Sequence, residues 1–167
     1  MRLFVFRDSA IVIVTMGLFI LSPENMALQI CLGVGLGLSA YLFHEWAHWL
    51  GARLVNAKID SPDFILSPFL FSFDSEANST RQFVHMTWPG FLATAIYITA
   101  YDLLLPDTLW GQIAWWMAVA LTLATVIIEG PLALWAVLRE DLPPVEIPFL
   151  GENRVLNQLF DRVQGGS

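Results

Sequence analysis

Four long apolar stretches constrain the fold of this 167-residue chain more than any other feature of its sequence. They cover about residues 3–22, 27–52, 83–105 and 109–138. A helix of about 20 apolar residues is long enough to cross the hydrocarbon core of a bilayer. Only 14% of the residues are charged and 56% are hydrophobic, whereas soluble domains average roughly 25% charged residues. The sequence therefore predicts an all-α integral membrane protein, a single domain over residues 1–167 with about four transmembrane helices.

The first apolar stretch is the weakest of the four, because Arg7 and Asp8 interrupt it. A short apolar run behind two arginines is also typical of a signal peptide, but such a peptide ends in a small-x-small cleavage site. The residues that follow, Ser22-Pro23-Glu24-Asn25, contain no site of that kind. We therefore expect an uncleaved first helix.

The basic residues predict how the helices are oriented. All eight lie before or near the start of the first stretch, between the second and third, or after the fourth, and the other two connections contain none. They are Arg2, Arg7, Arg53, Lys58, Arg81, Arg139, Arg154 and Arg162. Because Lys and Arg accumulate on cytoplasmic loops, we expect a multi-pass protein with both termini, and the tail 139–167, in the cytoplasm. The net charge of -7 offers no basic surface to nucleic acid, so membrane lipid is the expected partner.

The connection 56–82 differs in kind from the apolar stretches around it. It contains short β-prone runs, Ile59-Asp60-Ser61, Phe64-Ile65-Leu66 and Phe69–Phe73, which Pro62 and Pro68 separate. Runs of this type predict short strands. We expect a small hairpin-like segment on the cytoplasmic side, between the second and third helices.

One motif carries the chemistry, His44-Glu45-Trp46-Ala47-His48 in the second stretch. Histidines four residues apart lie one turn apart on the same helical face, so both imidazoles can reach one metal ion. Imidazole ligands suit Zn²⁺, and Glu45 is then placed to act as a general base on water. Gly33, Gly37 and Ala40 share that face, and small residues allow neighbouring helices to approach closely. The alternative is a pair of interfacial histidines that bind no metal.

A hydrolytic zinc site usually has a third protein ligand, and Glu129 is the predicted one. It is acidic, it lies deep in the fourth apolar stretch, and at 1.5 Å per residue its depth matches that of the histidines. Thr122, Thr125 and Glu129 form a polar stripe, and Gly130-Pro131 is expected to break the helix locally and free the carboxylate to turn towards a metal. The alternative is a protonated Glu129 bonded to a neighbouring oxygen. His85 is a weaker ligand candidate.

With these residues the chain resembles the site-2 protease family of intramembrane zinc metalloproteases, over roughly residues 27–156. Phe43–Leu54 looks like the HExxH helix of that family, and Ala57–Phe73 is similar to its membrane-associated strands. Pro89–Thr94 stands where the family has a Gly-Pro-x-Ala-Asn segment, with Thr94 in place of the Asn. The resemblance implies a bound Zn²⁺ and a strand edge with which an extended substrate can pair.

The sequence departs from the family at the third ligand, which the family takes from a Leu-Asp-Gly motif. Two carboxylates compete for this role. Ile128-Glu129-Gly130 keeps an acid before a glycine inside the apolar stretch. Residues 147–156 resemble the flanks of the family motif, but Gly151 stands where the Asp belongs and Glu152 lies one position later. Depth favours Glu129, and the flanking residues favour Glu152 as the alternative.

The resemblance implies hydrolysis of a peptide bond in or near a transmembrane segment of a protein substrate. Zn²⁺ would be held by His44, His48 and a carboxylate, with Glu45 as the general base. The rival hypothesis is a non-catalytic relative, a membrane subunit that acts as scaffold or binding partner in a larger complex. A third interpretation uses the histidines as pigment or haem ligands, but it leaves Glu45 without a role.

Overall fold

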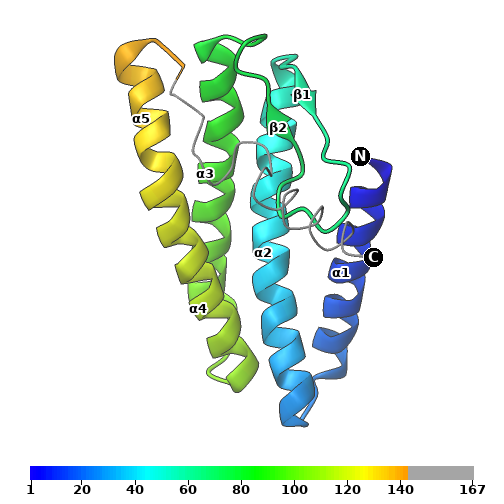
Figure 1. Cartoon of the computed structure of the whole chain (residues 1–167). Helices are drawn as coiled ribbons and strands as arrows, with labels where there is room; N and C mark the ends of the chain where they lie inside the picture. Colours follow the sequence, from blue (N-terminus) through cyan, green and yellow to red (C-terminus); the bar gives the residue numbers. More distant parts are fainter. Residues whose placement is uncertain (143–167) are drawn as a thin grey trace, which may run out of the picture.

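Four long helices, running alternately in opposite directions, form most of the fold (Figure 1). The structure, a computed structural model, describes residues 1–142. The helices are α1 (Arg2–Leu21), α2 (Met26–Leu54), α3 (Thr80–Leu104) and α4 (Leu109–Ala124), which continues through a π-helical turn, η1 (Thr125–Glu129), into α5 (Gly130–Arg139). The four predicted helices are confirmed, close to their predicted bounds. Glu152 and most of the predicted tail lie outside the described residues.

Polar residues at the connections explain where the helices begin. The Asn25 side chain accepts hydrogen bonds from the backbone amides of Ala27 and Leu28 at the start of α2. Ser79 and Gln82 form a reciprocal capping box at the start of α3. Such caps satisfy amide groups that have no partner within the helix. The capping box explains why α3 begins at Thr80, before the predicted residue 83.

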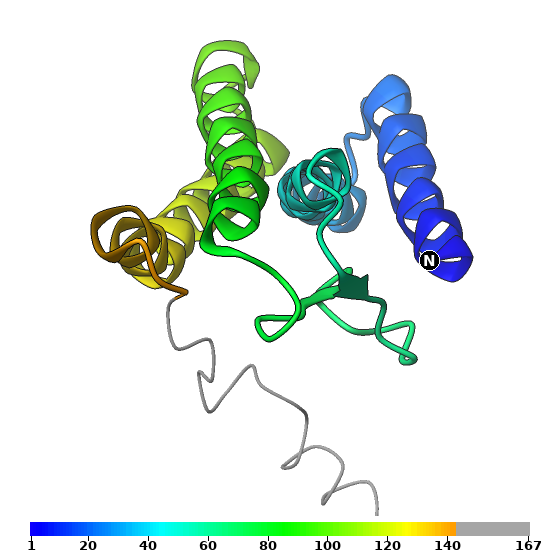
Figure 2. The same cartoon turned by 90° about the horizontal axis from the view of Figure 1, so that it is seen from above.

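α2 lies at the centre of the bundle and packs against α1, α3 and α4 (Figure 2). A Cβ atom on Gly37 would lie 2.6 Å from the sulfur of Met117 in α4, and one on Gly51 would lie 2.7 Å from the backbone oxygen of His85 in α3. Only glycine permits helices to approach so closely. The inward face of α2 is therefore the predicted one, and its buried residues include Gly33, Gly37, Ala40, His44, His48 and Gly51.

Most of the large apolar side chains point away from the bundle. By length and composition, three helical runs are apolar enough to cross a membrane, namely α1, α2 and the continuous run Leu109–Arg139. α3 is 25 residues long but less apolar than these three runs, and it is not among the helices that are apolar enough to cross a membrane. At most 28% of the residues in the three apolar segments are buried. So much exposed apolar surface is unfavourable in water and suits lipid.

The fourth helix widens just before Pro131. The backbone amide of Gly130 bonds to the carbonyl of Thr125, five residues earlier, so that Thr125–Glu129 forms a π-helical turn. Pro131 has no amide hydrogen, and in a regular helix its ring would clash with the carbonyl four residues before it. The wider turn relieves this clash. The predicted break at Gly130-Pro131 is therefore wrong: the helix continues through the proline, because the wider turn accommodates its ring.

The connection between α2 and α3 contains two antiparallel strands, β1 (Ile59–Asp60) and β2 (Ser72–Phe73). The predicted hairpin-like segment is thus confirmed. The strands are joined by a loop, residues 61–71, and the β-prone run Phe64-Ile65-Leu66 belongs to this loop and not to a strand. Pro62 and Pro68 flank the run, and proline interrupts the hydrogen bonding of a sheet.

Polar contacts join the start of β1 to the end of β2, at what we call the strand base. Lys58 Nζ lies 2.8 Å from Asp74 Oδ2, and the hydrogen bond from Lys58 holds the pKa of the Asp74 carboxyl below its ordinary value. Asn78 bonds to both the amide and the carbonyl of Lys58, each at 2.7 Å. These contacts fix where the connection leaves α2 and where it returns to α3.

Candidate metal centre

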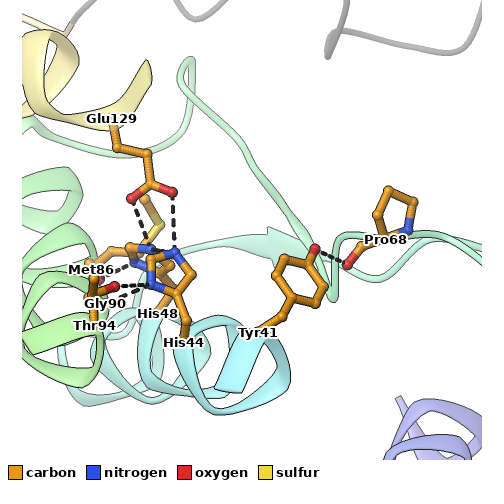
Figure 3. Close-up of polar contacts among 8 residues, drawn as sticks. All are labelled: Tyr41, His44, His48, Pro68, Met86, Gly90, Thr94 and Glu129. Atoms are coloured by element: carbon orange, nitrogen blue, oxygen red, sulfur yellow. Dashed lines mark hydrogen bonds and ion pairs between the residues drawn. The ribbon is translucent and has the colours of Figure 1, made fainter. Parts of the chain in front are cut away.

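His44, His48 and Glu129 meet between α2, α3 and η1 (Figure 3). The Nε2 atoms of the two histidines are 3.1 Å apart. Glu129 places Oε1 3.1 Å from His44 Nε2 and Oε2 3.1 Å from His48 Nε2. His44 and His48 are 1% and 8% exposed, whereas the Glu129 side chain keeps 30% of its surface exposed. The fold thus brings together three side chains that the sequence predicted as ligands.

Each imidazole is held in place by its other ring nitrogen. His48 Nδ1 lies 2.9 Å from the backbone oxygen of Met86. His44 Nδ1 lies 3.1 Å from the backbone oxygen of Gly90 and 2.9 Å from the Thr94 hydroxyl. A backbone carbonyl can only accept a hydrogen bond, so we assign the proton to Nδ1 in both rings. In a neutral imidazole, Nε2 then keeps the lone pair that binds a metal.

Four acceptor atoms consequently face one another, the two Nε2 atoms and the two carboxylate oxygens of Glu129. Within residues 1–142, none of the hydrogen bonds to these atoms comes from a group outside the cluster. Lone pairs and negative charge at this distance repel one another unless a cation or a proton lies between them. The cluster therefore requires a metal ion or a proton, carried by one of the imidazoles or by the Glu129 carboxyl.

The separations in the cluster fit a zinc ion. Tetrahedral zinc with bonds of about 2.0–2.1 Å holds neighbouring ligand atoms about 3.3 Å apart. The three contacts among His44, His48 and Glu129 are each 3.1 Å, so shifts of a few tenths of an ångström would admit the ion. Two imidazoles and one carboxylate are also a known ligand set of catalytic zinc sites.

Gly90 forms the wall of the cluster on the α3 side. A Cβ atom at this position would lie 2.1 Å from His48 Cε1 and 2.2 Å from His48 Nε2. Because Gly90 has no side chain, α3 can lie directly against the imidazole while its carbonyl holds His44. Sequence reasoning singled out Gly90 only for its place in the family resemblance, and nothing in the sequence marks a backbone carbonyl as a contact.

Glu45, the predicted general base, is buried beside the cluster, with 8% of its surface exposed. Its carboxylate lies against the backbone of Leu70 in the loop 61–71 and beside the Tyr41 side chain. Leu70 is fully buried, and the Tyr41 hydroxyl donates a hydrogen bond to the backbone oxygen of Pro68 (Figure 3). The loop therefore covers Glu45.

Of the remaining ligand candidates, the structure describes only His85. His85 is exposed near the start of α3 and bonds through Nδ1 to the Arg81 carbonyl at 2.7 Å, so the weaker ligand candidate is not brought to the site. Glu152 lies outside the described residues. Thr125, one turn before Glu129, is 2% exposed, as expected for a stripe that faces the interior.

An ion pair beside the motif was not predicted. Asp8 of α1 is 4% exposed; it pairs with Arg7 Nε at 2.6 Å and accepts a hydrogen bond from the indole of Trp46 at 2.8 Å. From the sequence, both charges were only an interruption of the first apolar stretch. The available signal was their isolation in that stretch, because intramembrane charges usually have a partner or a function.

Comparisons with known proteins leave the family open. No protein-family model, curated protein or solved structure matches this chain. A functional hypothesis therefore depends on the site itself.

Proposed function

We propose that this chain is an intramembrane zinc metalloprotease-like hydrolase, which cleaves a peptide bond in or near a transmembrane segment. The observation that carries the proposal is the convergence of His44, His48 and Glu129 through four acceptor atoms. The burial of Glu45 beside them supplies a carboxylate that is not needed as a ligand. The sequence resemblance to the site-2 protease family, which includes the same motif, agrees with the proposal.

We place the site inside the bilayer, towards the cytoplasmic side, with both termini in the cytoplasm. The basic residues within residues 1–142 lie in or next to the α2–α3 connection, in the first turns of α1, or at the end of α5. These positions are at the same end of the bundle and fit the rule that positive charge stays inside. At 1.5 Å per residue, His44 is about 15 Å from the Leu54 end of α2 and about 27 Å from its Met26 end.

Each residue of the proposed site has a separate role in the reaction. When bound, zinc supplies Lewis acidity, which polarises a carbonyl and lets water act as a nucleophile near neutral pH. Glu45 accepts a proton from the attacking water and delivers it to the leaving amine. The Met86 and Gly90 carbonyls and the Thr94 hydroxyl keep both imidazoles in the protonation state that leaves Nε2 free.

A transmembrane helix is a poor substrate until it unwinds, because its carbonyls are engaged in hydrogen bonds within the helix. β1 or β2 could hold an unwound segment extended by adding it as a further strand. The exposed part of the Glu129 side chain marks the side from which such a segment could approach the cluster.

A non-catalytic membrane subunit, a scaffold or binding partner, is the second candidate. The observation that favours it concerns Thr94, which stands where the family has an Asn. Its hydroxyl is already bonded to His44, so it is not free to contact a substrate carbonyl. In that case zinc would have a structural role, or the cluster would contain a protonated imidazole.

The test measures zinc and cleavage in the same purified full-length chain. We expect about one zinc per chain, lost in His44→Ala and Glu129→Gln but retained in Glu45→Gln. Glu45→Gln should abolish cleavage of a reconstituted transmembrane substrate. Glu152→Gln tests the alternative ligand, and the exposed Glu24→Gln is the matched control.

Three outcomes would contradict the proposal in different ways. If the purified wild-type chain contains no zinc, the proposed metal centre is refuted. Zinc that is lost in Glu152→Gln but kept in Glu129→Gln assigns the third ligand to the tail. If zinc is bound as expected but Glu45→Gln does not affect cleavage, the assignment of Glu45 as the general base is refuted.

A further inference from the structure

The N-terminal helix is bonded to the loop that covers Glu45. Arg7 donates through Nη1 to the backbone oxygens of Ile65 at 2.7 Å and Ser67 at 2.8 Å. These contacts join residues about 60 positions apart in the sequence. Within the helical bundle, α1 packs against α2, and its buried residues are Phe4, Asp8 and Thr15. Two hydrogen bonds from Arg7 thus connect α1 to the loop.

Asp8 fixes the position of Arg7. One carboxylate oxygen pairs with Arg7 Nε at 2.6 Å, and the other accepts from the Trp46 indole of α2 at 2.8 Å. The Arg7 guanidinium also lies 4.8 Å from the centre of the Phe4 ring. Charge-assisted bonds of this kind are stronger than neutral ones. Moving Arg7 away would leave the buried Asp8 charge without its partner, which is costly.

Hydrogen bonds within the loop 61–71 connect its residues to one another. The Ser67 amide bonds to the Phe64 carbonyl at 2.9 Å, and the Ser67 hydroxyl bonds to the Phe69 carbonyl at 3.0 Å. Tyr41 adds a tie from α2 to the Pro68 carbonyl. Because Ser67 is bonded to Phe69, we expect a displacement at Ser67 to shift the next residue, Leu70, which is fully buried and lies against Glu45.

We propose that Arg7 and Asp8 form a latch that holds the loop 61–71 closed over Glu45, and that a substrate reaches Glu45 when the bonds from Arg7 to the loop open. Arg7 binds backbone carbonyls in this loop and not side chains, so an extended peptide backbone presents the same acceptors. The class of ligand that would open the latch is therefore an unwound peptide segment. Arg7 and Asp8 are positioning residues, because they act on Glu45 through Leu70.

The role of the latch in substrate entry rests on the proposed function, but closure of the loop can be measured without zinc or cleavage. We use the full chain in membranes, with the exposed Cys31 changed to Ser and Leu70→Cys introduced as a reporter. The rate of reaction with a membrane-permeant maleimide then measures opening. Backbone amide exchange over residues 61–71, in chains that keep Leu70, provides a second measurement.

Arg7→Gln should raise both rates at least about tenfold, since bonds to a charged donor stabilise the closed state by more than neutral ones. Arg7→Lys should restore part of the protection, because it keeps the charge next to Asp8. The exposed Arg2→Gln is the matched control and should leave both rates unchanged.

Equal rates in wild type and Arg7→Gln would overturn the latch. If Arg7→Gln does not fold, Asp8→Asn decides, because it removes the charge that pairs with Arg7 Nε; a folded Asp8→Asn chain with unchanged rates also overturns the latch. A zinc-free chain in which Arg7→Gln opens the loop would refute the hydrolase and support the latch. Zinc-dependent cleavage, together with unchanged rates of maleimide reaction and amide exchange in Arg7→Gln, would support the hydrolase and refute the latch.

Discussion

Replacing Gly90 with alanine should strongly weaken zinc binding and leave the helices folded. The new Cβ would lie 2.1 Å from His48 Cε1, whereas ordinary contacts begin at 3.4 Å. The imidazole must therefore move by about 1.3 Å, several times the tolerance of about 0.2 Å in a metal–ligand bond. Changing a residue that only supports a ligand costs about 10–100-fold in metal affinity. Displacing His48 itself should cost about 100-fold or more.

The stability of the metal-free chain should change little. Moving His48 breaks its bond to the Met86 carbonyl, which costs about 1 kcal/mol, but alanine is favoured over glycine in a helix by a similar amount. We would measure zinc affinity by chelator competition and stability by thermal unfolding of the metal-free chain. Gly17→Ala is the control, since nothing lies within 4 Å of its Cβ position. Wild-type zinc affinity in Gly90→Ala would refute the placement of His48.

Three further changes test other parts of the structure. Thr94→Val removes one of two acceptors from His44 Nδ1 and should lower zinc affinity about tenfold in a chelator titration; unchanged affinity would show that the hydroxyl is dispensable. Pro131→Ala restores an amide hydrogen, so a regular helix can compete with the π-helical turn and rotate Glu129 away; we expect weaker zinc binding without loss of helical circular dichroism. At the strand base, the pKa of Asp74 is lowered by its lysine partner, so its stabilisation is present above the ordinary pKa and lost as the pH falls through the lowered one; amide exchange of β1 and β2 should rise in that range in wild type but not in Asp74→Asn.

The helices and the motif could be predicted because both depend on local patterns. A run of apolar residues identifies a helix wherever it packs, and a spacing of four places His44 and His48 on one face. Glu129 could be matched to them because antiparallel helices that cross the same layer bring equal depths together. The capping box at Ser79 was equally local, and it accounts for the earlier start of α3.

The covering of Glu45 could not be predicted in the same way. It depends on Arg7 meeting backbone carbonyls in the loop 61–71, and a carbonyl is present at every residue. The sequence therefore does not indicate which ones a distant guanidinium will select. For the same reason, the role of Gly90 is visible only once α3 lies against His48.

The positions of the three clustered residues in the sequence have a consequence for the stability of the folded protein. Glu129 follows His44 by 85 residues, so an ion shared by them would cross-link the early and late halves of the chain. A ligand that binds only the folded state adds about 1.4 kcal/mol of stability for each tenfold rise in its free concentration above Kd. Resistance to unfolding, and with it survival against proteolysis, would then follow the supply of zinc.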